Sequence, residues 1–263
     1  MTDFFTFASS SSGNSYFINS ENCGILIDCG ISFRRITEGL LSENISTENI
    51  RGIILTHEHT DHINGLSVLL KHLNIPVYAS PEVLKYLISN NIVTGKTILN
   101  PIDMNGELIG NMMVKPFKTS HDSVGSLGFA ISLPNGKRIS VCTDTGYITD
   151  SAKNCITGSN TVLIESNYDD MMLRMGPYPF GLKKRIASSV GHLSNIDCAS
   201  FLPELVKNNT EHIILGHLSK ENNIPELAVE TSVSELSMAG MKRDKDYTIF
   251  AAPRATLSEK IVL

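Results

Sequence analysis

Short apolar runs alternate with amphipathic stretches along the chain, and their two periods predict both strands and helices. Runs rich in Ile and Val that end at turn residues predict strands at 14–19, 24–28, 51–56, 76–79, 112–118, 127–133, 138–143, 160–165, 212–215 and 247–251. Apolar positions three and four apart predict helices at 32–41, 62–73, 81–90, 182–190, 195–207 and 225–237. Residues 1–7 read as a further strand, because no basic segment with a long apolar run marks a signal peptide.

The order of these elements indicates the layering of the fold. Pairs of the hairpin type, such as the pair joined at Pro134-Asn135-Gly136, stand beside strand–helix units. This mixture favours α/β architecture, with sheets packed together and helices outside, as a single domain over residues 1–263. In the helix at 195–207, Asn195 is the expected N-cap and Asp197 lies in the first turn.

Composition and charge narrow the classes of function. The net charge of −5 argues against binding of nucleic acid by overall electrostatics alone, although bound divalent cations would supply local positive charge. No run of about 18 apolar residues occurs, so we expect no membrane span. The five cysteines form no Cys-x-x-Cys pair, which favours reduced thiols and a cytoplasmic location.

A dense set of metal-binding side chains follows one of the apolar strands. His57, His59, Asp61 and His62 lie within six residues, and the first two project to the same side of an extended chain. Thr60 is placed to cap the next helix, whose first turn would direct Asp61 and His62 at the same point. Solvated loop histidines are the ordinary alternative, but this spacing of four ligands argues against it. Imidazole and carboxylate suit Zn²⁺, Mn²⁺ or Fe²⁺ better than Ca²⁺.

Further ligand candidates stand elsewhere in the chain. His121, Asp144 and His217 each follow an apolar run closely, and strand ends hold side chains rigidly. Taken alone, each of these residues is as readily an ordinary polar residue. Together with the first cluster they supply enough ligands for two divalent metal ions, with Zn²⁺ or Mn²⁺ expected and Fe²⁺ left open.

These residues make the chain resemble the metallo-β-lactamase superfamily over essentially its whole length. Asp28, in the run Ile-Leu-Ile-Asp-Cys-Gly, is similar to the first motif of that superfamily. The cluster at 57–62 and then His121, Asp144 and His217 are similar to motifs two to five, in the same order. The resemblance implies a four-layer αββα sandwich with the site at one edge of two facing sheets.

The resemblance also implies a role for each residue of the set. It assigns one metal to His57, His59 and His121, a second metal to Asp61, His62 and His217, and a bridging position to Asp144. Asp28 would orient a ligand histidine without binding metal itself.

Further segments resemble the nuclease-like branch of the superfamily, which includes transfer-RNA 3′-processing enzymes. These segments are Glu165-Ser166-Asn167 and Gly191-His192-Leu193-Ser194. The YycJ/WalJ-type subgroup of predicted exonucleases is more similar still, through the serine-rich run at 9–15 and the run at 217–223. No insertion resembles a nucleic-acid-clamping domain or the flexible arm of the transfer-RNA enzymes, which argues against structured RNA as the substrate.

The resemblance and the ligand set together predict hydrolysis of a phosphodiester, with a metal-bridging hydroxide as the nucleophile. A proton donor assists this reaction because an alkoxide is a poor leaving group. We expect His192 to be that donor, with Glu165 bonded to it and keeping it protonated. Asp61 would additionally orient the attacking water. The alternative for His192 is that it caps the backbone of the following helix.

Substrate contacts are predicted from weaker signals. Ser10, Ser12 and Asn14 lie in the serine-rich run, which forms either an anion-binding nest or a plain turn between strands. Asn167, beside the Glu-Ser pair, is a further candidate. The run Lys183-Lys184-Arg185 either touches a phosphate backbone or forms a solvated helix face.

The favoured function is that of a nuclease acting from an end of a nucleic acid, with DNA favoured over RNA. A thioester hydrolase of the hydroxyacylglutathione type has a very similar ligand set, and a small cyclic phosphodiester is a third substrate to test. Glu165 with His192 favours phosphodiester chemistry, because thiolate leaves without a proton donor. Three other classes fit the sequence less well. A β-lactamase commonly has a Cys ligand, and no cysteine stands in a ligand position here. A diiron protein of this fold typically has Glu in place of His59, and an inactive binding module loses ligands that this chain retains. End polarity, native metal and oligomeric state stay open.

Overall fold

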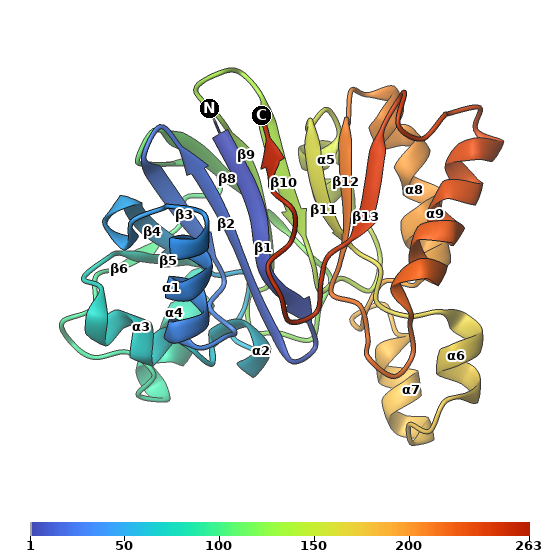
Figure 1. The fold of residues 1–263 in the computed structure, drawn as a ribbon. Helices are drawn as coiled ribbons and strands as arrows, with labels where there is room; N and C mark the ends of the chain where they lie inside the picture. Colours follow the sequence, from blue (N-terminus) through green and yellow to red (C-terminus); the bar gives the residue numbers. More distant parts are fainter. Residues whose placement is uncertain (1) are drawn as a thin grey trace.

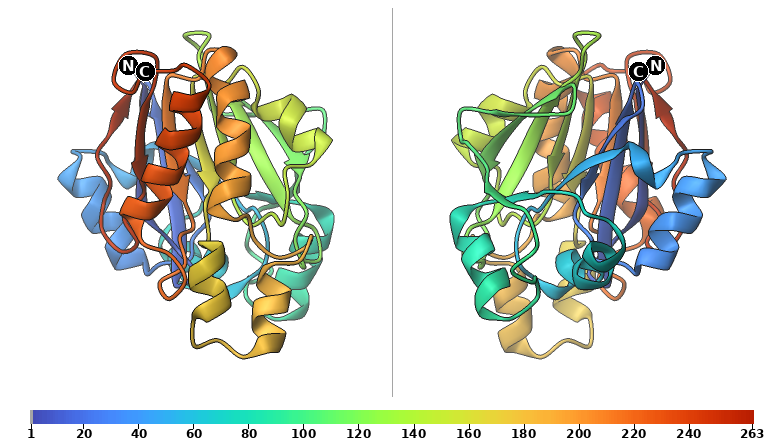
Figure 2. Two further views of the ribbon diagram at one scale, coloured as in Figure 1. Left: turned by 90° about the vertical axis from the view of Figure 1, so that its right-hand side faces the viewer. Right: turned by 90° about the vertical axis from the view of Figure 1, so that its left-hand side faces the viewer.

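The computed structural model describes residues 2–263, whose strands form two seven-stranded sheets. The sheets stack face to face with helices on both outer sides, so the layers run helix, sheet, sheet, helix (Figures 1 and 2). The αββα sandwich expected from the resemblance is therefore confirmed. Within the described residues, none of the helices combines the length and the apolar character needed to span a bilayer.

The first sheet has antiparallel pairs at one side and parallel pairs at the other. The pairs from β14 to β3 are antiparallel, and those from β3 to β6 are parallel. In spatial order its strands are β14 (Ile261–Val262), β1 (Thr2–Ser10), β2 (Gly13–Ser20), β3 (Cys23–Ile27), β4 (Ile50–Ile54), β5 (Val77–Ala79) and β6 (Leu99–Pro101). The strand expected at 1–7 is part of β1, except for Met1, which lies outside the described residues.

The second sheet repeats this mixed design. The pairs from β13 to β10 are parallel, and those from β10 to β7 are antiparallel. In spatial order its strands are β13 (Thr248–Ala251), β12 (His212–Gly216), β11 (Thr161–Glu165), β10 (Arg138–Cys142), β9 (Leu127–Ser132), β8 (Met112–Lys118) and β7 (Glu107–Ile109).

The longer helices cover the outer faces of the sheets, and two short helices project beyond the lower edge in Figure 1. The first sheet is covered by α1 (Phe33–Ser42), α3 (Leu66–His72) and α4 (Pro81–Ser89), and the second by α5 (Asp150–Ile156), α8 (Asn195–Lys207) and α9 (Pro225–Met238). The short α2 (Thr60–Ile63), the single 3₁₀ turn η1 (Thr47–Asn49) and the projecting α6 (Asp170–Met175) and α7 (Phe180–Ile186) complete the described helices.

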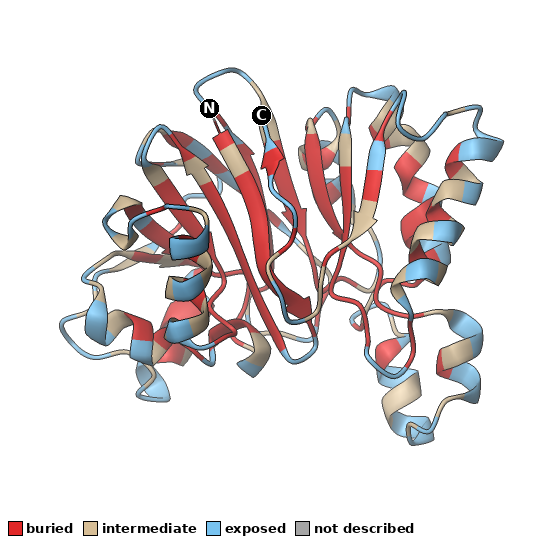
Figure 3. Ribbon diagram, viewed as in Figure 1, coloured by how far each residue is buried: buried red, intermediate tan, exposed pale blue. Residues whose placement is uncertain are grey.

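Strand alternation sorts the apolar side chains into an inner core and two outer ones. In β3, Ile25 and Ile27 pack between the sheets, while Leu26 packs under the helices of the first sheet. In β11, Leu163 belongs to the inner core and Ile164 to the core beneath α8 and α9. The strands are accordingly buried along most of their length (Figure 3). The result is a rigid frame for the loops that follow the strands.

Several element ends differ from the sequence prediction. The helix expected at 62–73 is split into α2 and α3 at Gly65, whose backbone packs against the carbonyl of Ile31. His59, and not Thr60, is the N-cap of α2, and no side-chain hydrogen bond caps this helix. The helix expected at 182–190 is α7, which begins and ends earlier.

The cap of α8 also differs from the prediction. Ser194, and not Asn195, occupies the N-cap, and its Oγ accepts a hydrogen bond from the backbone N–H of Asp197 at 3.0 Å. Asp197 does lie in the first turn, as expected. Because Ser194 fulfils the capping role, the alternative of His192 as a helix cap loses its basis.

The carboxyl ends of the parallel strands in both sheets lie at one edge of the sandwich, and the loops that follow these strands meet there. The segments that follow β3, β4, β10, β11 and β12 all lie at the lower edge in Figure 1. Each of these strands is followed closely by one of the residues or clusters predicted to form the site. The fold therefore gathers segments that are as much as 189 positions apart, from Asp28 to His217.

Candidate metal centre

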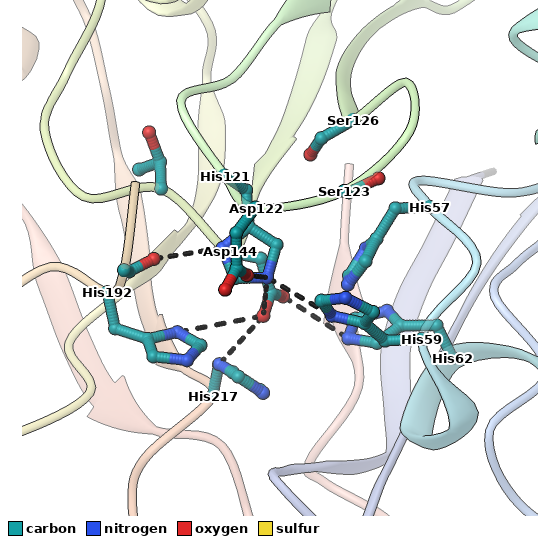
Figure 4. Close-up of polar contacts among 12 residues, drawn as sticks. His57, His59, His62, His121, Asp122, Ser123, Ser126, Asp144, His192 and His217 are labelled. Atoms are coloured by element: carbon teal, nitrogen blue, oxygen red, sulfur yellow. Dashed lines mark hydrogen bonds and ion pairs between the residues drawn. The ribbon is translucent and has the colours of Figure 1, made fainter. Parts of the chain in front are cut away.

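The predicted ligands converge on one another at this edge, although they come from separate loops (Figure 4). Their nitrogen and oxygen atoms form overlapping groups in which every member lies within 4.8 Å of the others. These groups are His57 with His59 and His121, Asp61 with His62 and His217, His57 with His62 and Asp144, and Asp144 with Glu165, His192 and His217. The structure thus brings the whole predicted ligand set together.

The first group is made of imidazoles. His57 and His59 follow β4, and their ring centroids are 4.6 Å apart. The ring of His121, in the loop after β8, lies 5.0 Å from each of them. His121 Nε2 faces His59 Nδ1 at 3.2 Å. Ring nitrogens directed at one another in this way form a nitrogen pocket of the kind that Zn²⁺ prefers.

The second group combines a carboxylate with two imidazoles. Asp61 and His62 lie in α2, directly after the first two histidines. Asp61 Oδ2 is 3.4 Å from His62 Nε2 and 3.3 Å from His217 Nε2. His217 enters from the loop after β12, on the other sheet, so both sheets contribute to this group.

Asp144 lies between the two groups. Its Oδ2 is 3.2 Å from His62 Nε2, and its Oδ1 is 3.4 Å from His217 Nδ1 and 3.7 Å from His121 Nε2. The dashed lines of Figure 4 show these contacts radiating from one carboxylate. A side chain that touches members of both groups occupies the position expected of a bridging ligand.

A second layer of contacts orients the ligand histidines. Most of them direct Nδ1 at a protein acceptor and leave Nε2 toward the cluster. The partners of Nδ1 are Thr56 Oγ1 for His57 at 3.0 Å, Asp28 Oδ2 for His62 at 2.7 Å, the Gly191 carbonyl for His121 at 2.9 Å and Glu165 Oε1 for His217 at 2.8 Å. Such acceptors fix the tautomer and the ring orientation that a metal ligand needs.

Asp28 lies where the sequence prediction placed it, behind a ligand and not among the ligands. Its carboxylate is fully buried and accepts hydrogen bonds from Thr56 N at 2.8 Å, Thr56 Oγ1 at 2.8 Å and His62 Nδ1 at 2.7 Å. Through these bonds Asp28 connects β3 to the end of β4 and orients His62.

Glu165 and His192 form the pair expected from the sequence. His192 Nδ1 lies 2.8 Å from Glu165 Oε1, and the other carboxylate oxygen accepts from Thr145 N at 2.7 Å. Glu165 is fully buried, whereas the His192 side chain keeps 15% of its surface exposed. Glu165 also contacts His217 Nδ1 at 2.8 Å, a contact that the sequence prediction did not include.

The buried carboxylates of the cluster raise the pKa values of two ligand histidines. Burial lowers the pKa of His62, but Asp144 and Asp28 outweigh this effect and hold that pKa well above the ordinary value. Burial also opposes the charge on His217, but Asp144 and the bonds to Asp61 and Glu165 raise its pKa to about 10. Protons on these imidazoles therefore compete with a cation for the same nitrogens.

The donor set fits divalent cations. His57 Nε2 and Asp144 Oδ2 are buried and make no hydrogen bond, although Asp144 Oδ2 lies 3.2 Å from His62 Nε2. Unpaired buried polar atoms are costly unless something else satisfies them. A cation held by imidazole and carboxylate would satisfy both atoms, and this mixture suits Zn²⁺, Mn²⁺ or Fe²⁺.

Strained backbone occurs at the same loops. Asp28, Asp144 and His217 have positive φ values of 57°, 56° and 55°, a region that residues with a Cβ enter at a cost of about 1–2 kcal/mol. Each follows the end of its strand within two residues. Strain of this kind concentrates at functional sites, where the surrounding structure maintains it.

Two of the residues predicted to contact substrate are buried beside ligand residues. Asn14 is fully buried, and its amide Nδ2 lies 3.1 Å from Asp61 Oδ2 and 3.0 Å from His62 Nε2. Asn167 is also buried and donates to the carbonyl of His217 at 2.7 Å. Both amides therefore support ligand loops. Ser12, in contrast, is exposed at the β1–β2 turn.

The other residues predicted to contact substrate are Ser10 and the run at 183–185, and most of them bond to other parts of the protein. Ser10 is 5% exposed, and its hydroxyl donates to the carbonyl of Arg254 at 3.4 Å. In α7, Arg185 is paired with Asp122 at 2.5 Å, and Lys183 donates to a backbone carbonyl at 2.8 Å. Lys184 and Arg185 are exposed, and Lys184 is the member of that run whose side chain makes neither an ion pair nor a hydrogen bond within the described residues.

Sequence reasoning missed two supporting residues at the cluster of residues 57–62, Thr56 and Glu58. Thr56 Oγ1 touches Asp28, His57 and His62 at once, at 2.8, 3.0 and 3.1 Å. Glu58, buried among the ligands, accepts from Ser123 Oγ at 2.6 Å and Val124 N at 3.0 Å. Glu58 thereby holds the loop that carries His121. The presence of a carboxylate between two ligand histidines was the available signal.

Comparison with known proteins agrees with this geometry. Residues 24–217 match the family described as the Beta-lactamase superfamily domain. The chain belongs to this superfamily, and the predictions of the family and of a metal-dependent hydrolase are both confirmed.

Named relatives cover nearly the whole chain. The exodeoxyribonuclease YycJ of Bacillus anthracis is 38% identical over 237 residues, covering 89% of this chain and 88% of the relative. The exodeoxyribonuclease WalJ of Streptococcus pneumoniae is 35% identical over 247 residues, covering 92% and 91%. Among solved structures, the metallo-beta-lactamase fold protein YhfI from Bacillus subtilis has a TM-score of 0.72 at 15% identity and 98% coverage of both chains, which supports the fold.

Proposed function

We propose that the protein is a nuclease that hydrolyses phosphodiesters of DNA from an end and uses two divalent metal ions. The contact that carries this proposal is the 2.8 Å bond between His192 Nδ1 and Glu165 Oε1 at the rim of the ligand cluster. The names of the relatives, both exodeoxyribonucleases, support DNA as the substrate.

The family resemblance implies how the ligands would divide between two ions. One ion would be held by His57, His59 and His121, the other by Asp61, His62 and His217, and Asp144 would touch both. Two such ions supply Lewis acidity, which neutralises charge on the phosphate and makes water nucleophilic near neutral pH. The protein groups then position the substrate and move protons.

His192 is suited to donate a proton to the departing ester oxygen. Glu165 accepts the Nδ1 hydrogen, which leaves the partly exposed Nε2 edge of the ring for the substrate. Because Glu165 also holds His217, one buried carboxylate fixes the donor relative to the ligand cluster. The carboxylate of Asp61, 22% exposed, is the member of its group that can accept a hydrogen bond from an incoming water.

This pair separates the proposal from thioester hydrolysis. An alkoxide leaves poorly without a proton, whereas thiolate and p-nitrophenolate leave readily. His192→Ala should therefore slow DNA cleavage by roughly 10²–10⁴-fold. Turnover of bis-p-nitrophenyl phosphate should fall far less, because its leaving group needs no donor. A merely structural histidine would affect both substrates equally.

The test uses end-labelled single- and double-stranded DNA and RNA, with Mn²⁺ or Zn²⁺ added to the purified protein. We expect stepwise shortening of DNA from one end and greater activity on DNA than on RNA. The control is His212→Ala, since His212 lies at the opposite end of β12 and bonds Thr248 at 2.8 Å. Loss of metal from His192→Ala would make His192 a ligand, and failure of the metal-loaded protein to cleave any nucleic acid would contradict the proposal.

A further inference from the structure

A small pocket of about 280 Å³ is lined by residues that adjoin Asn14 and follow His217 in the chain. It is formed by the turn between β1 and β2, the helix α1, the loop after His217 and the segment that leads from β13 to β14. Its polar lining includes Ser10, Ser12, Arg35, Lys220 and Arg254. The pocket therefore combines hydroxyl groups with a concentration of positive charge.

The positive charge of this pocket is not neutralised by the protein. Some cations of the described residues are paired with carboxylates, as Lys153 is with Glu204 at 2.6 Å. Among residues 2–263, no carboxylate lies within ion-pair distance of Arg35, Lys220 or Arg254. In a protein with a net charge of −5, an unpaired group of this kind attracts an anion.

The two arginines are held in place by backbone carbonyls. Arg35 Nη2 donates to Ala255 O at 2.9 Å, and Arg254 Nη2 donates to Ser219 O and Asn223 O at 2.8 Å each. Arg254 Nε is buried and has no hydrogen-bond partner. Guanidinium groups fixed in this way retain donors for a ligand and lose little side-chain entropy when it binds.

Two chain segments connect the pocket to the ligand cluster. Gly13 lines the pocket, and the next residue, Asn14, contacts Asp61 Oδ2 at 3.1 Å. Lys220 stands three residues after His217. A ligand in the pocket would therefore contact the same two chain segments that lead to the Asp61–His62–His217 group. The volume is below the range of about 300–1,000 Å³ typical of sites for drug-sized ligands, so it suits one phosphate and part of its sugar.

We propose that this pocket binds a phosphate group of the nucleic-acid strand, next to the phosphodiester that lies at the metal centre. The inference rests on the proposed function and adds a substrate contact to it. Arg35, Lys220 and Arg254 supply the charge, and the hydroxyl of Ser12 supplies a further donor. The phosphate is either the terminal group of the strand or an internal one of its backbone, and these sources are separable by experiment.

The experiment measures binding and not cleavage. The probes are fluorescently labelled hexadeoxynucleotides with a phosphorothioate backbone, which resists hydrolysis, and they carry a 5′-phosphate, a 3′-phosphate or hydroxyls at both ends. Their affinity for the purified protein is read by fluorescence anisotropy. Lys220→Gln tests the pocket with little risk to folding, because the Lys220 side chain makes no hydrogen bond or ion pair within the described residues. Arg35→Gln/Lys220→Gln removes both peripheral charges and leaves Arg254 in its structural bonds.

The matched control is Lys245→Gln, which removes the same charge in the loop before β13, at the opposite edge of the sheet. We expect the double variant to bind at least about 10-fold more weakly, as for loss of charge-assisted hydrogen bonds, while the control binds normally. Weakening confined to one end-phosphorylated probe identifies a terminal phosphate, and equal weakening of all probes identifies a backbone phosphate. Binding by the double variant that equals the control overturns the inference.

The binding result is independent of the proposed reaction. If the protein cleaves no DNA but the pocket variants lose affinity, the proposed nuclease function fails and the phosphate site stands. If the protein cleaves DNA while the variants bind and cleave like the control, the pocket assignment fails and the nuclease function stands.

Discussion

The substitution Asp28→Asn tests how strongly the second layer of contacts controls the metal centre. The change keeps the size of the side chain and replaces one carboxylate oxygen by an amide NH₂. Oδ1 can still accept from Thr56 N, but the NH₂ group then faces the hydroxyl of Thr56 and the Nδ1–H of His62, which are bonded at 2.8 and 2.7 Å in the native protein.

The least costly response to this conflict is a change of tautomer at His62. Its Nδ1 would then accept a hydrogen bond from the new amide, and the proton would move to Nε2, the atom directed at Asp61 and Asp144. A protonated Nε2 cannot donate a lone pair to a cation. Loss of such supporting contacts lowers metal affinity by about 10–100-fold, which corresponds to about 1.4–2.8 kcal/mol.

The assay is a competition titration of Zn²⁺ between the protein and a chromophoric chelator. Thr210→Val is the control, because it removes a buried hydrogen bond to Ser159 O of 2.7 Å at the opposite edge of the sheet. It should cost about 1 kcal/mol of unfolding free energy and leave Zn²⁺ affinity unchanged. Native Zn²⁺ affinity in a folded Asp28→Asn protein would refute the reasoning about His62.

Further predictions concern packing, metal and surface charge. Gly30→Ala should abolish metal binding and lower the melting temperature, because the new Cβ would meet the Asp61 carbonyl at 1.7 Å; native metal content would contradict this. Zn²⁺ at about 100 times its dissociation constant should raise Tm by at least about 5 °C in a thermal melt, reversed by chelator, and an unchanged Tm would count against a metal site. If Lys184 contacts a phosphate, Lys184→Gln should reduce the slope of log affinity for DNA against log salt by about 0.9, while an unchanged slope identifies a solvated helix face.

Most strands of the two sheets could be predicted because the sequence shows the apolar periods of strands and of helices. Buried strands such as β11 are continuous apolar runs, and their ends are marked by the polar residues of the site. Several short elements were not predicted, among them β6, β7, β14, α5 and α6. The helices α5 and α6 have seven and six residues, and α6 exposes Met171 and Met175, so neither shows an apolar stripe long enough to recognise.

The metal ligands could be predicted from the sequence, whereas most of the contacts that orient them could not. His57, His59, Asp61 and His62 are adjacent in the chain, so their spacing alone indicated a metal site. The supporting contacts depend on tertiary structure. The acceptor for His121 is the backbone carbonyl of Gly191, 70 positions away, and no side-chain pattern records it.

Asn14 is a further contact that depends on tertiary structure and could not be predicted from the sequence. The serine-rich run indicated phosphate contacts, and the exposed turn at Ser12 does line a cationic pocket. Asn14, however, belongs to β2, and its amide contacts Asp61 and His62. Strand alternation sends neighbouring residues to opposite sides, and only the pairing of β1 with β2 defines which side faces the cluster.

The most direct test of the central claim is anomalous X-ray diffraction from crystals grown with Zn²⁺ or Mn²⁺. The account predicts two peaks, one contacted by the imidazoles of His57, His59 and His121 and the other by Asp61, His62 and His217, with Asp144 touching both. Well-ordered crystals with saturating metal and no peak at this cluster, or with His121, Asp144 and His217 turned away from a bound ion, would contradict it.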